Sequence, residues 1–243
     1  MDTIVAKITN DSLTDKKIYE QAGKILREGG LVAFPTETVY GLGADALDEE
    51  ASAKIYAAKG RPSDNPLIVH IADIEALYKL SCEVPDKALK LADKFWPGPL
   101  TMILKKSDIV PDSITGGLGT VAIRMPSHKV AAELIRTSGV YIAAPSANTS
   151  GKPSPTRASH VIKDLSGKID MIIEDDTVDI GVESTIIDLS EEVPTILRPG
   201  YITKEMFEEV IGVVRIDPAI TEGVKSGVVP KAPGMKYKHY APD

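Results

Sequence analysis

Short apolar runs alternate with segments of helical periodicity along most of this 243-residue chain. Residues of helical spacing that end at glycine or proline indicate helices, whereas isolated apolar runs of four or five residues indicate buried strands. This criterion predicts helices at 15–28, 49–58, 73–80, 86–95, 128–137 and 204–211. It predicts strands at 31–34, 67–71, 100–104, 121–125, 140–143, 171–173, 185–189 and 195–197.

Such alternation favours an α/β fold in which helices flank a twisted sheet of mixed strand direction. From Pro218 onward the periodicity stops, and Gly, Pro, Lys and Tyr dominate. The only break in pattern lies near Val214. We therefore expect a catalytic domain at 1–213. Residues 214–243 are expected to form a linker or a tail that covers an active site.

Composition narrows the class of protein. The net charge of −7 gives no support to broad nucleic-acid binding, although an acidic average can hide a local basic cleft. No run approaches the roughly 20 apolar residues of a membrane span, and the first ten residues carry no signal pattern. The single cysteine, Cys82, argues against disulfides and cysteine-rich zinc sites. These features predict a cytoplasmic protein that does not bind membranes.

The segment Lys59-Gly-Arg-Pro-Ser-Asp-Asn-Pro-Leu67 combines two cations with two prolines directly before an apolar strand. Proline limits the freedom of the chain and lowers the entropy cost of a fixed binding site. A solvated basic turn is the simpler interpretation of a charged loop, but this stiffness favours an anion site, with a polyphosphate as the first candidate. His70 follows on the strand, close enough to contribute.

Three further segments bring polar groups to strand ends. Arg124 lies within an apolar strand, where its charge needs either a protein carboxylate or a substrate carboxylate as partner. Arg198 repeats this pattern. The loop from Ala144 to Thr156 is dense in hydroxyl and amide groups, which can surround phosphates, although a flexible linker has a similar composition. Standard nucleotide-binding and nucleophile motifs are missing from the sequence.

Together, five segments resemble the YrdC/Sua5 family, the threonylcarbamoyl-AMP synthases, in the same order from about Leu13 to Gly200. They are Phe34-Pro-Thr-Glu-Thr-Val-Tyr-Gly-Leu-Gly43, the Lys59–Leu67 segment, Trp96-Pro-Gly-Pro-Leu-Thr101, Val121-Ala-Ile-Arg-Met-Pro126 and Ala144-Pro-Ser-Ala-Asn148. The tail Pro233-Gly-Met-Lys-Tyr-Lys-His-Tyr-Ala-Pro242 is similar to the linker of the longer Sua5 branch, after which a further domain follows. Because the sequence stops at Asp243, we expect that C-terminal domain to be absent.

The resemblance implies a nucleotidyltransferase with a deep, positively charged concave face. L-Threonine, bicarbonate and ATP would give threonylcarbamoyl-AMP and pyrophosphate, and a transferase complex would use the product to modify adenosine 37 of tRNAs that read codons beginning with A. Threonine would be bound by Thr38, His70, Arg124, Ala144 and Ser184. ATP would be bound by Arg61, Asn65, Thr120, Ser146, Ser154, Arg198 and Tyr237.

The implied chemistry needs charge neutralisation and positioning, and it needs no protein nucleophile. Lys59 and Arg61 are expected to be the catalytic cations, and Mg²⁺ would be bound through the ATP phosphates without a protein metal site. Two alternatives remain at this stage. Carbamoyl-adenylate formation, as in hydrogenase-maturation proteins, would call for cysteine clusters that this sequence lacks. A module that binds tRNA or double-stranded RNA through the basic face would show salt-dependent binding without ATP turnover.

Overall fold

A mixed sheet of eleven strands forms the centre of the computed structural model, which describes residues 2–60, 62, 65–175, 178–222 and 232. The strands are β1 (Ile4–Lys7), β2 (Val32–Phe34), β3 (Gly41–Asp45), β4 (Ile68–His70), β5 (Leu100–Lys105), β6 (Thr120–Arg124), β7 (Ile142–Ala143), β8 (Met171–Glu174), β9 (Thr185–Asp188), β10 (Thr195–Arg198) and β11 (Arg215–Ile216). Their order in the sheet is β1-β8-β2-β3-β7-β4-β6-β5-β9-β10-β11. Parallel pairs such as β4–β6 and antiparallel pairs such as β5–β6 both occur, so the predicted mixed sheet is confirmed.

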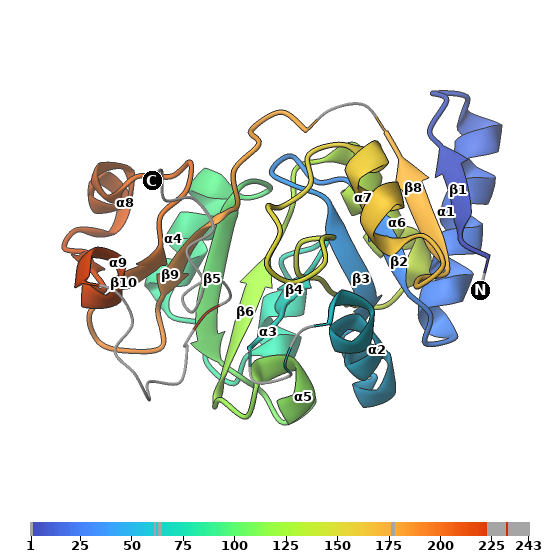
Figure 1. Cartoon of the computed structure of the whole chain (residues 1–243). Helices are drawn as coiled ribbons and strands as arrows, with labels where there is room; N and C mark the ends of the chain where they lie inside the picture. The colour runs from blue at the N-terminus through green and yellow to red at the C-terminus, as the bar shows by residue number, and fades with distance from the viewer. Residues whose placement is uncertain (1, 61, 63–64, 176–177, 223–231, 233–243) are drawn as a thin grey trace.

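Helices flank this sheet. They are α1 (Ser12–Arg27), α2 (Glu49–Lys59), α3 (Ala76–Leu80), α4 (Asp86–Phe95), α5 (Asp112–Thr115), α6 (Lys129–Ser138), α7 (Ala158–Leu165), α8 (Lys204–Ile211) and α9 (Pro218–Glu222). Figure 1 shows α1 beside β1 at one end of the molecule and α8 near β10 at the other. None of the described helices is both long and apolar enough to cross a membrane.

Alternation of side chains along the strands divides the core. Val32 and Phe34 on β2 pack with α1 and α6, whereas Leu31 and Ala33 face the larger cluster on the opposite side of the sheet. This arrangement follows from the two-residue period of a strand, which sends neighbouring side chains to opposite faces. The sheet is therefore covered on both faces at this end.

A third, smaller apolar cluster lies on the strands between β4 and β10. It contains Ile68, Ile103, Ala122, Ile186 and Leu197, together with Ala232 from the C-terminal segment. Ala232 has no exposed surface. A residue from the segment expected to be a tail thus packs directly on the sheet, next to strands that carry predicted site residues.

The register of four neighbouring strands aligns polar residues in one row. His70 on β4 pairs with Arg124 on β6, and Arg124 pairs with Thr101 on β5. On the far side, β5 pairs with β9, which begins at Thr185 directly after Ser184. Residues that are distant in the sequence are therefore brought together at one edge of these strands.

Candidate functional site

A pocket of about 60 Å³ opens where this polar row meets the loops after β2 and β7. All five residues predicted to bind threonine line it, as do two of those predicted to bind ATP, Ser146 and Arg198. The remaining lining residues were not singled out as site residues from the sequence: Thr36, Val39, Tyr40, Gly41, Ile68, Pro145 and Glu183. A larger groove of about 410 Å³ lies between α4 and the end of β9, but it contains none of the predicted site residues.

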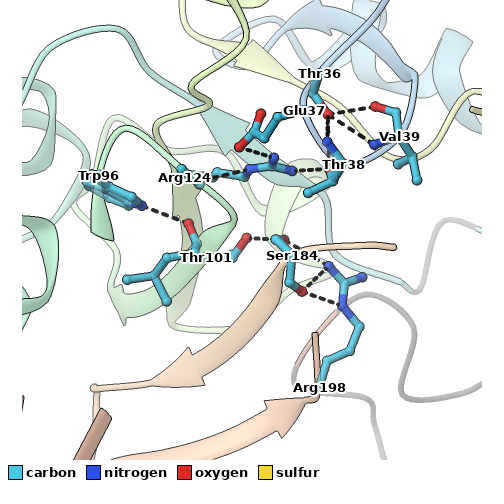
Figure 2. Close-up of polar contacts among 11 residues, drawn as sticks. Thr36, Glu37, Thr38, Val39, Trp96, Thr101, Arg124, Ser184 and Arg198 are labelled. Carbon is cyan, nitrogen blue, oxygen red and sulfur yellow. Dashed lines mark hydrogen bonds and ion pairs between the residues drawn. The ribbon is translucent and has the colours of Figure 1, made fainter. Parts of the chain in front are cut away.

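Arg124 is buried in this pocket and forms an ion pair with Glu37. The guanidinium Nη2 lies 2.7 Å from Glu37 Oε1, and both side chains are about 95% buried. Nη1 donates to Thr38 Oγ1 at 2.9 Å, and Nε donates to the Gly98 carbonyl at 3.4 Å (Figure 2). Burial by itself raises the pKa of Glu37, but the charge and hydrogen bond of Arg124 outweigh it, so the pKa is lowered. The protein carboxylate that the Arg124 position called for is thus Glu37.

The loop after β2 fixes the direction of the Thr38 hydroxyl. Thr36 Oγ1 donates its only proton to the Val39 carbonyl at 2.6 Å, so in its 2.9 Å contact with Thr38 Oγ1 it must accept (Figure 2). Thr38 therefore donates to Thr36 and accepts from Arg124. Thr38 Oγ1 can therefore accept one further hydrogen bond, which a ligand could donate from an O–H or N–H group.

His70 is a buried, neutral imidazole. Burial and the nearby charge of Arg124 lower its pKa to about 3. Its Nδ1 lies 3.0 Å from the Ile68 carbonyl, which can only accept, so Nδ1 carries the proton and the lone pair is on Nε2. His70 can therefore accept a hydrogen bond from a ligand, but it is too weakly basic to take up a proton at neutral pH.

Ser184 and Arg198 form the opposite wall. Arg198 donates to the Ser184 carbonyl through Nε at 3.0 Å and Nη2 at 2.9 Å, and Nη2 also reaches Ser184 Oγ at 3.0 Å (Figure 2). Thr101 Oγ1 lies 2.7 Å from the same hydroxyl. These contacts connect Ser184, which was predicted to bind threonine, with Arg198, which was predicted to bind ATP.

Lys59 holds the loop that carries Ser146. The side chain is buried, and Nζ donates to the carbonyls of Ser146 and Asn148, the latter at 2.6 Å. In return, the Ser150 N–H donates to the Lys59 carbonyl at 2.9 Å. Ser146 Oγ donates to Asn148 Oδ1 at 2.6 Å. In the structure Lys59 therefore anchors the loop that carries Ser146. It does not line the pocket, and its contact with phosphates remains a prediction.

The other predicted ATP residues are dispersed around the pocket. Asn65 is buried, and among the described residues its Oδ1 has no hydrogen-bond partner, a costly state that a ligand donor would relieve. Thr120 begins β6 opposite Lys105 and does not line the pocket. Ser154 is buried and does not line the pocket, but it donates to Oε1 of Glu183, a lining residue, at 2.6 Å. Arg61 and Tyr237 lie outside the described residues.

Gly200 sets the position of the Glu183–Thr185 backbone. A Cβ at residue 200 would lie 2.6 Å from both the Glu183 carbonyl oxygen and the Thr185 nitrogen, which no real Cβ tolerates. Gly200→Ala should therefore displace Ser184, with a loss of about 1–3 kcal/mol in the free energy of unfolding. A crystal structure of the variant shows the position of Ser184, and urea denaturation measures the loss of stability.

Gly119→Ala is the matched control, because a Cβ there would meet no atom within 4 Å. It should leave both quantities unchanged. If Gly200→Ala behaves like Gly119→Ala, the close approach of Gly200 does not determine the geometry of the site.

The described residues contain no group of three or more His, Cys, Asp or Glu side chains arranged to bind a metal ion. The charged groups that line the pocket are Arg124, Arg198 and Glu183. This set provides hydrogen-bond donors and acceptors for a polar ligand with anionic parts.

Comparison with known proteins places this geometry in a family. The Sua5/YciO/YrdC family model, described as "Telomere recombination", matches residues 24–200. Threonylcarbamoyl-AMP synthase of Pyrococcus abyssi is 58% identical over 99% of this chain and 69% of its own length, and that of Bacillus subtilis is 54% identical over 97% and 67%. The crystal structure of P. abyssi Sua5 complexed with L-threonine superimposes with a TM-score of 0.92 at 55% identity, over all of this chain and 69% of that one.

One expectation from the sequence is wrong. The model described as "Threonylcarbamoyl-AMP synthase, C-terminal domain" matches residues 202–243, so the C-terminal Sua5 region is not absent. The match begins at Ile202, just before α8 and inside the segment assigned to the first domain. The sequence after Pro218 lacks the periodicity that indicates helices and strands. Its richness in Gly, Pro, Lys and Tyr therefore led to the prediction of a linker.

The family match covers most of the chain and includes every described residue that lines the pocket, and the chain therefore belongs to the Sua5/YciO/YrdC family.

Proposed function

We propose that this protein is a threonylcarbamoyl-AMP synthase that converts L-threonine, bicarbonate and ATP into threonylcarbamoyl-AMP and pyrophosphate. The observation that carries the proposal is the single pocket that Thr38, His70, Arg124, Ala144 and Ser184 line together with Ser146 and Arg198. The names of the curated relatives support the same reaction.

Threonine fits the polarity of the pocket. Arg124 donates hydrogen bonds from Nε and Nη1, while Nη2 is in the ion pair with Glu37 without a hydrogen bond to a described residue, which leaves donors for the threonine carboxylate. Thr38 and His70 supply acceptors for the hydroxyl and amino groups of the substrate. A buried acceptor left without its donor is costly, and for that reason the site would reject amino acids that lack the hydroxyl.

ATP would lie between the Ser146 loop and Arg198. Lys59 donates to two carbonyls of that loop, which holds Ser146 at the edge of the pocket. Arg198 supplies positive charge and Asn65 a buried amide, and Arg61 is proposed from its place in the Lys59–Leu67 segment. Thr120, Ser154 and Tyr237 remain proposed ATP contacts from the resemblance alone.

The reaction then proceeds by positioning and charge neutralisation. Threonine carbamate attacks the α-phosphorus of ATP through its oxygen, an O–P bond forms, and the bond to the β-phosphate oxygen breaks to release pyrophosphate. Both reactants are anions, so the arginines lower the barrier mainly by offsetting repulsion. Mg²⁺ would accompany ATP as the counterion of its phosphates. Burial of the site would protect the labile carbamate from water.

The C-terminal segment would cover this site. Ala232 is fully buried against a cluster that includes Ile68, and Ile68 also lines the pocket. We propose that residues 214–243 close over the nucleotide, with Tyr237 among them. The product would pass in the cytoplasm to a transferase complex that modifies adenosine 37 of tRNA.

The test is pyrophosphate release by the purified protein with ATP, Mg²⁺, bicarbonate and L-threonine. Release should depend on threonine and fall strongly when 2-aminobutyrate, which lacks the hydroxyl, replaces it. Release no faster than in a control without threonine would contradict the proposal. Salt-dependent binding of tRNA or duplex RNA without ATP turnover would favour the RNA-binding alternative.

A further inference from the structure

Glu183 introduces a negative charge into a pocket proposed to bind two anions. Of the described residues that line the pocket, it is the only one with a carboxylate. Its position is fixed: Ser154 Oγ donates to Oε1 at 2.6 Å, and Gly200 packs against its main-chain carbonyl. The charge of Arg124 is already balanced by Glu37, so the carboxylate of Glu183 is not needed to neutralise it.

A carboxylate beside phosphates and a carbamate raises the free energy of the complex unless it meets a cation. The substrate itself brings one, since the α-amino group of threonine is protonated at neutral pH. That proton must be removed before the nitrogen can attack a carbon atom. His70 cannot accept it, because burial and the charge of Arg124 lower the pKa of His70 to about 3.

We propose that the carboxylate of Glu183 binds the α-ammonium group of threonine and accepts its proton for carbamate formation. This inference rests on the proposed function. An N–H bond of the ammonium breaks and its proton passes to Glu183. The nitrogen lone pair then forms the N–C bond with bicarbonate, which loses water overall, and Glu183 returns its proton to solvent. Ser154 acts as a positioning residue that orients the carboxylate.

A binding cycle isolates the contact with the ammonium group. Glu183→Gln removes the charge but can still accept the Ser154 hydrogen bond, and Glu192→Gln on the exposed surface is the matched control. Calorimetry without ATP or bicarbonate would compare L-threonine with 3-hydroxybutyrate of the same configuration at the hydroxyl carbon, which lacks the amino group. Glu183→Gln should weaken threonine binding about tenfold or more and leave 3-hydroxybutyrate binding unchanged.

A pH profile separates proton transfer from binding alone. At saturating threonine, pyrophosphate release by Glu183→Gln should be about 100-fold slower than wild type at pH 7, and the deficit should shrink as pH rises and the free amine becomes abundant. Among the described residues, the charged and titratable groups that line the pocket with Glu183 are Tyr40, His70, Arg124 and Arg198, and Glu37 is paired with Arg124.

Two results would overturn the inference while leaving the proposed function intact. In one, wild type releases pyrophosphate with threonine, and Glu183→Gln keeps wild-type affinity and rate at every pH. In the other, the variant changes only the Mg²⁺ concentration required, which would assign the carboxylate to the metal–nucleotide complex. A wild-type protein that neither binds threonine nor turns over would instead refute the proposed function and this inference with it.

Discussion

Replacing Arg124 with methionine should lower the free energy of unfolding by about 3–5 kcal/mol and abolish threonine-dependent pyrophosphate release. The variant leaves the Glu37 carboxylate buried without its partner, 2.7 Å from where the guanidinium stood. It also removes the hydrogen bond that Arg124 donates to Thr38 Oγ1. Urea denaturation and the pyrophosphate assay measure the two losses.

The double variant Glu37→Gln/Arg124→Met tests the cause. Because it has no unpaired carboxylate, the double variant should regain most of the lost stability. Turnover should stay absent, because the site still lacks the Arg124 guanidinium that would bind the substrate. Lys105→Met, which breaks the exposed pair with Glu83, is the control and should change little. Equal stability losses in the single and double variants would show that the buried charge is not the reason.

The ion pair also predicts a pH dependence. The pKa of Glu37 in the folded protein is lowered from its ordinary value of 4.5, so its contribution to stability is present above pH 4.5 and is lost as pH falls through the folded pKa. The stability of wild type relative to the double variant should therefore decrease upon acidification below about pH 4.5. A difference that does not depend on pH would contradict this account.

Lys59→Met should have the second-largest effect, because it frees the Ser146 loop. The variant keeps the apolar stem but removes the donor to the buried carbonyl of Asn148 and to the half-buried carbonyl of Ser146. We expect a loss of about 2–4 kcal/mol in the free energy of unfolding and an ATP KM raised at least about tenfold. Denaturation and initial rates at varied ATP concentration measure both.

The stability measurement distinguishes two tasks for this lysine. If Lys59 acts only on phosphates, Lys59→Met should weaken ATP binding without destabilising the protein. If it anchors the loop, both quantities should change together. Lys90→Met on the exposed face of α4 is a control for loss of a lysine charge and should alter neither.

Much of the fold followed from periodicity. The helix at 204–211 and the strand that begins at Leu100 are found where the sequence predicted them. In contrast, β1, β3 and α7 were not predicted. The sequence of β3, Gly-Leu-Gly-Ala-Asp, has little intrinsic preference for a strand. It becomes one because it pairs with β2 and β7, where a Cβ at Gly43 would come within 2.6 Å of the Ile142 side chain.

For the site, the sequence by itself determined which chemical groups are present: the buried arginine on an apolar strand, the stiff Lys59–Leu67 segment and the polar loop around Ser146. Only the tertiary structure decided how their charges and protons are arranged. It pairs Arg124 with Glu37, turns Lys59 towards carbonyls and places Glu183 in the pocket. The reason is physical, since ion pairs and hydrogen bonds depend on separations of a few ångströms that strand register sets between residues distant in the sequence.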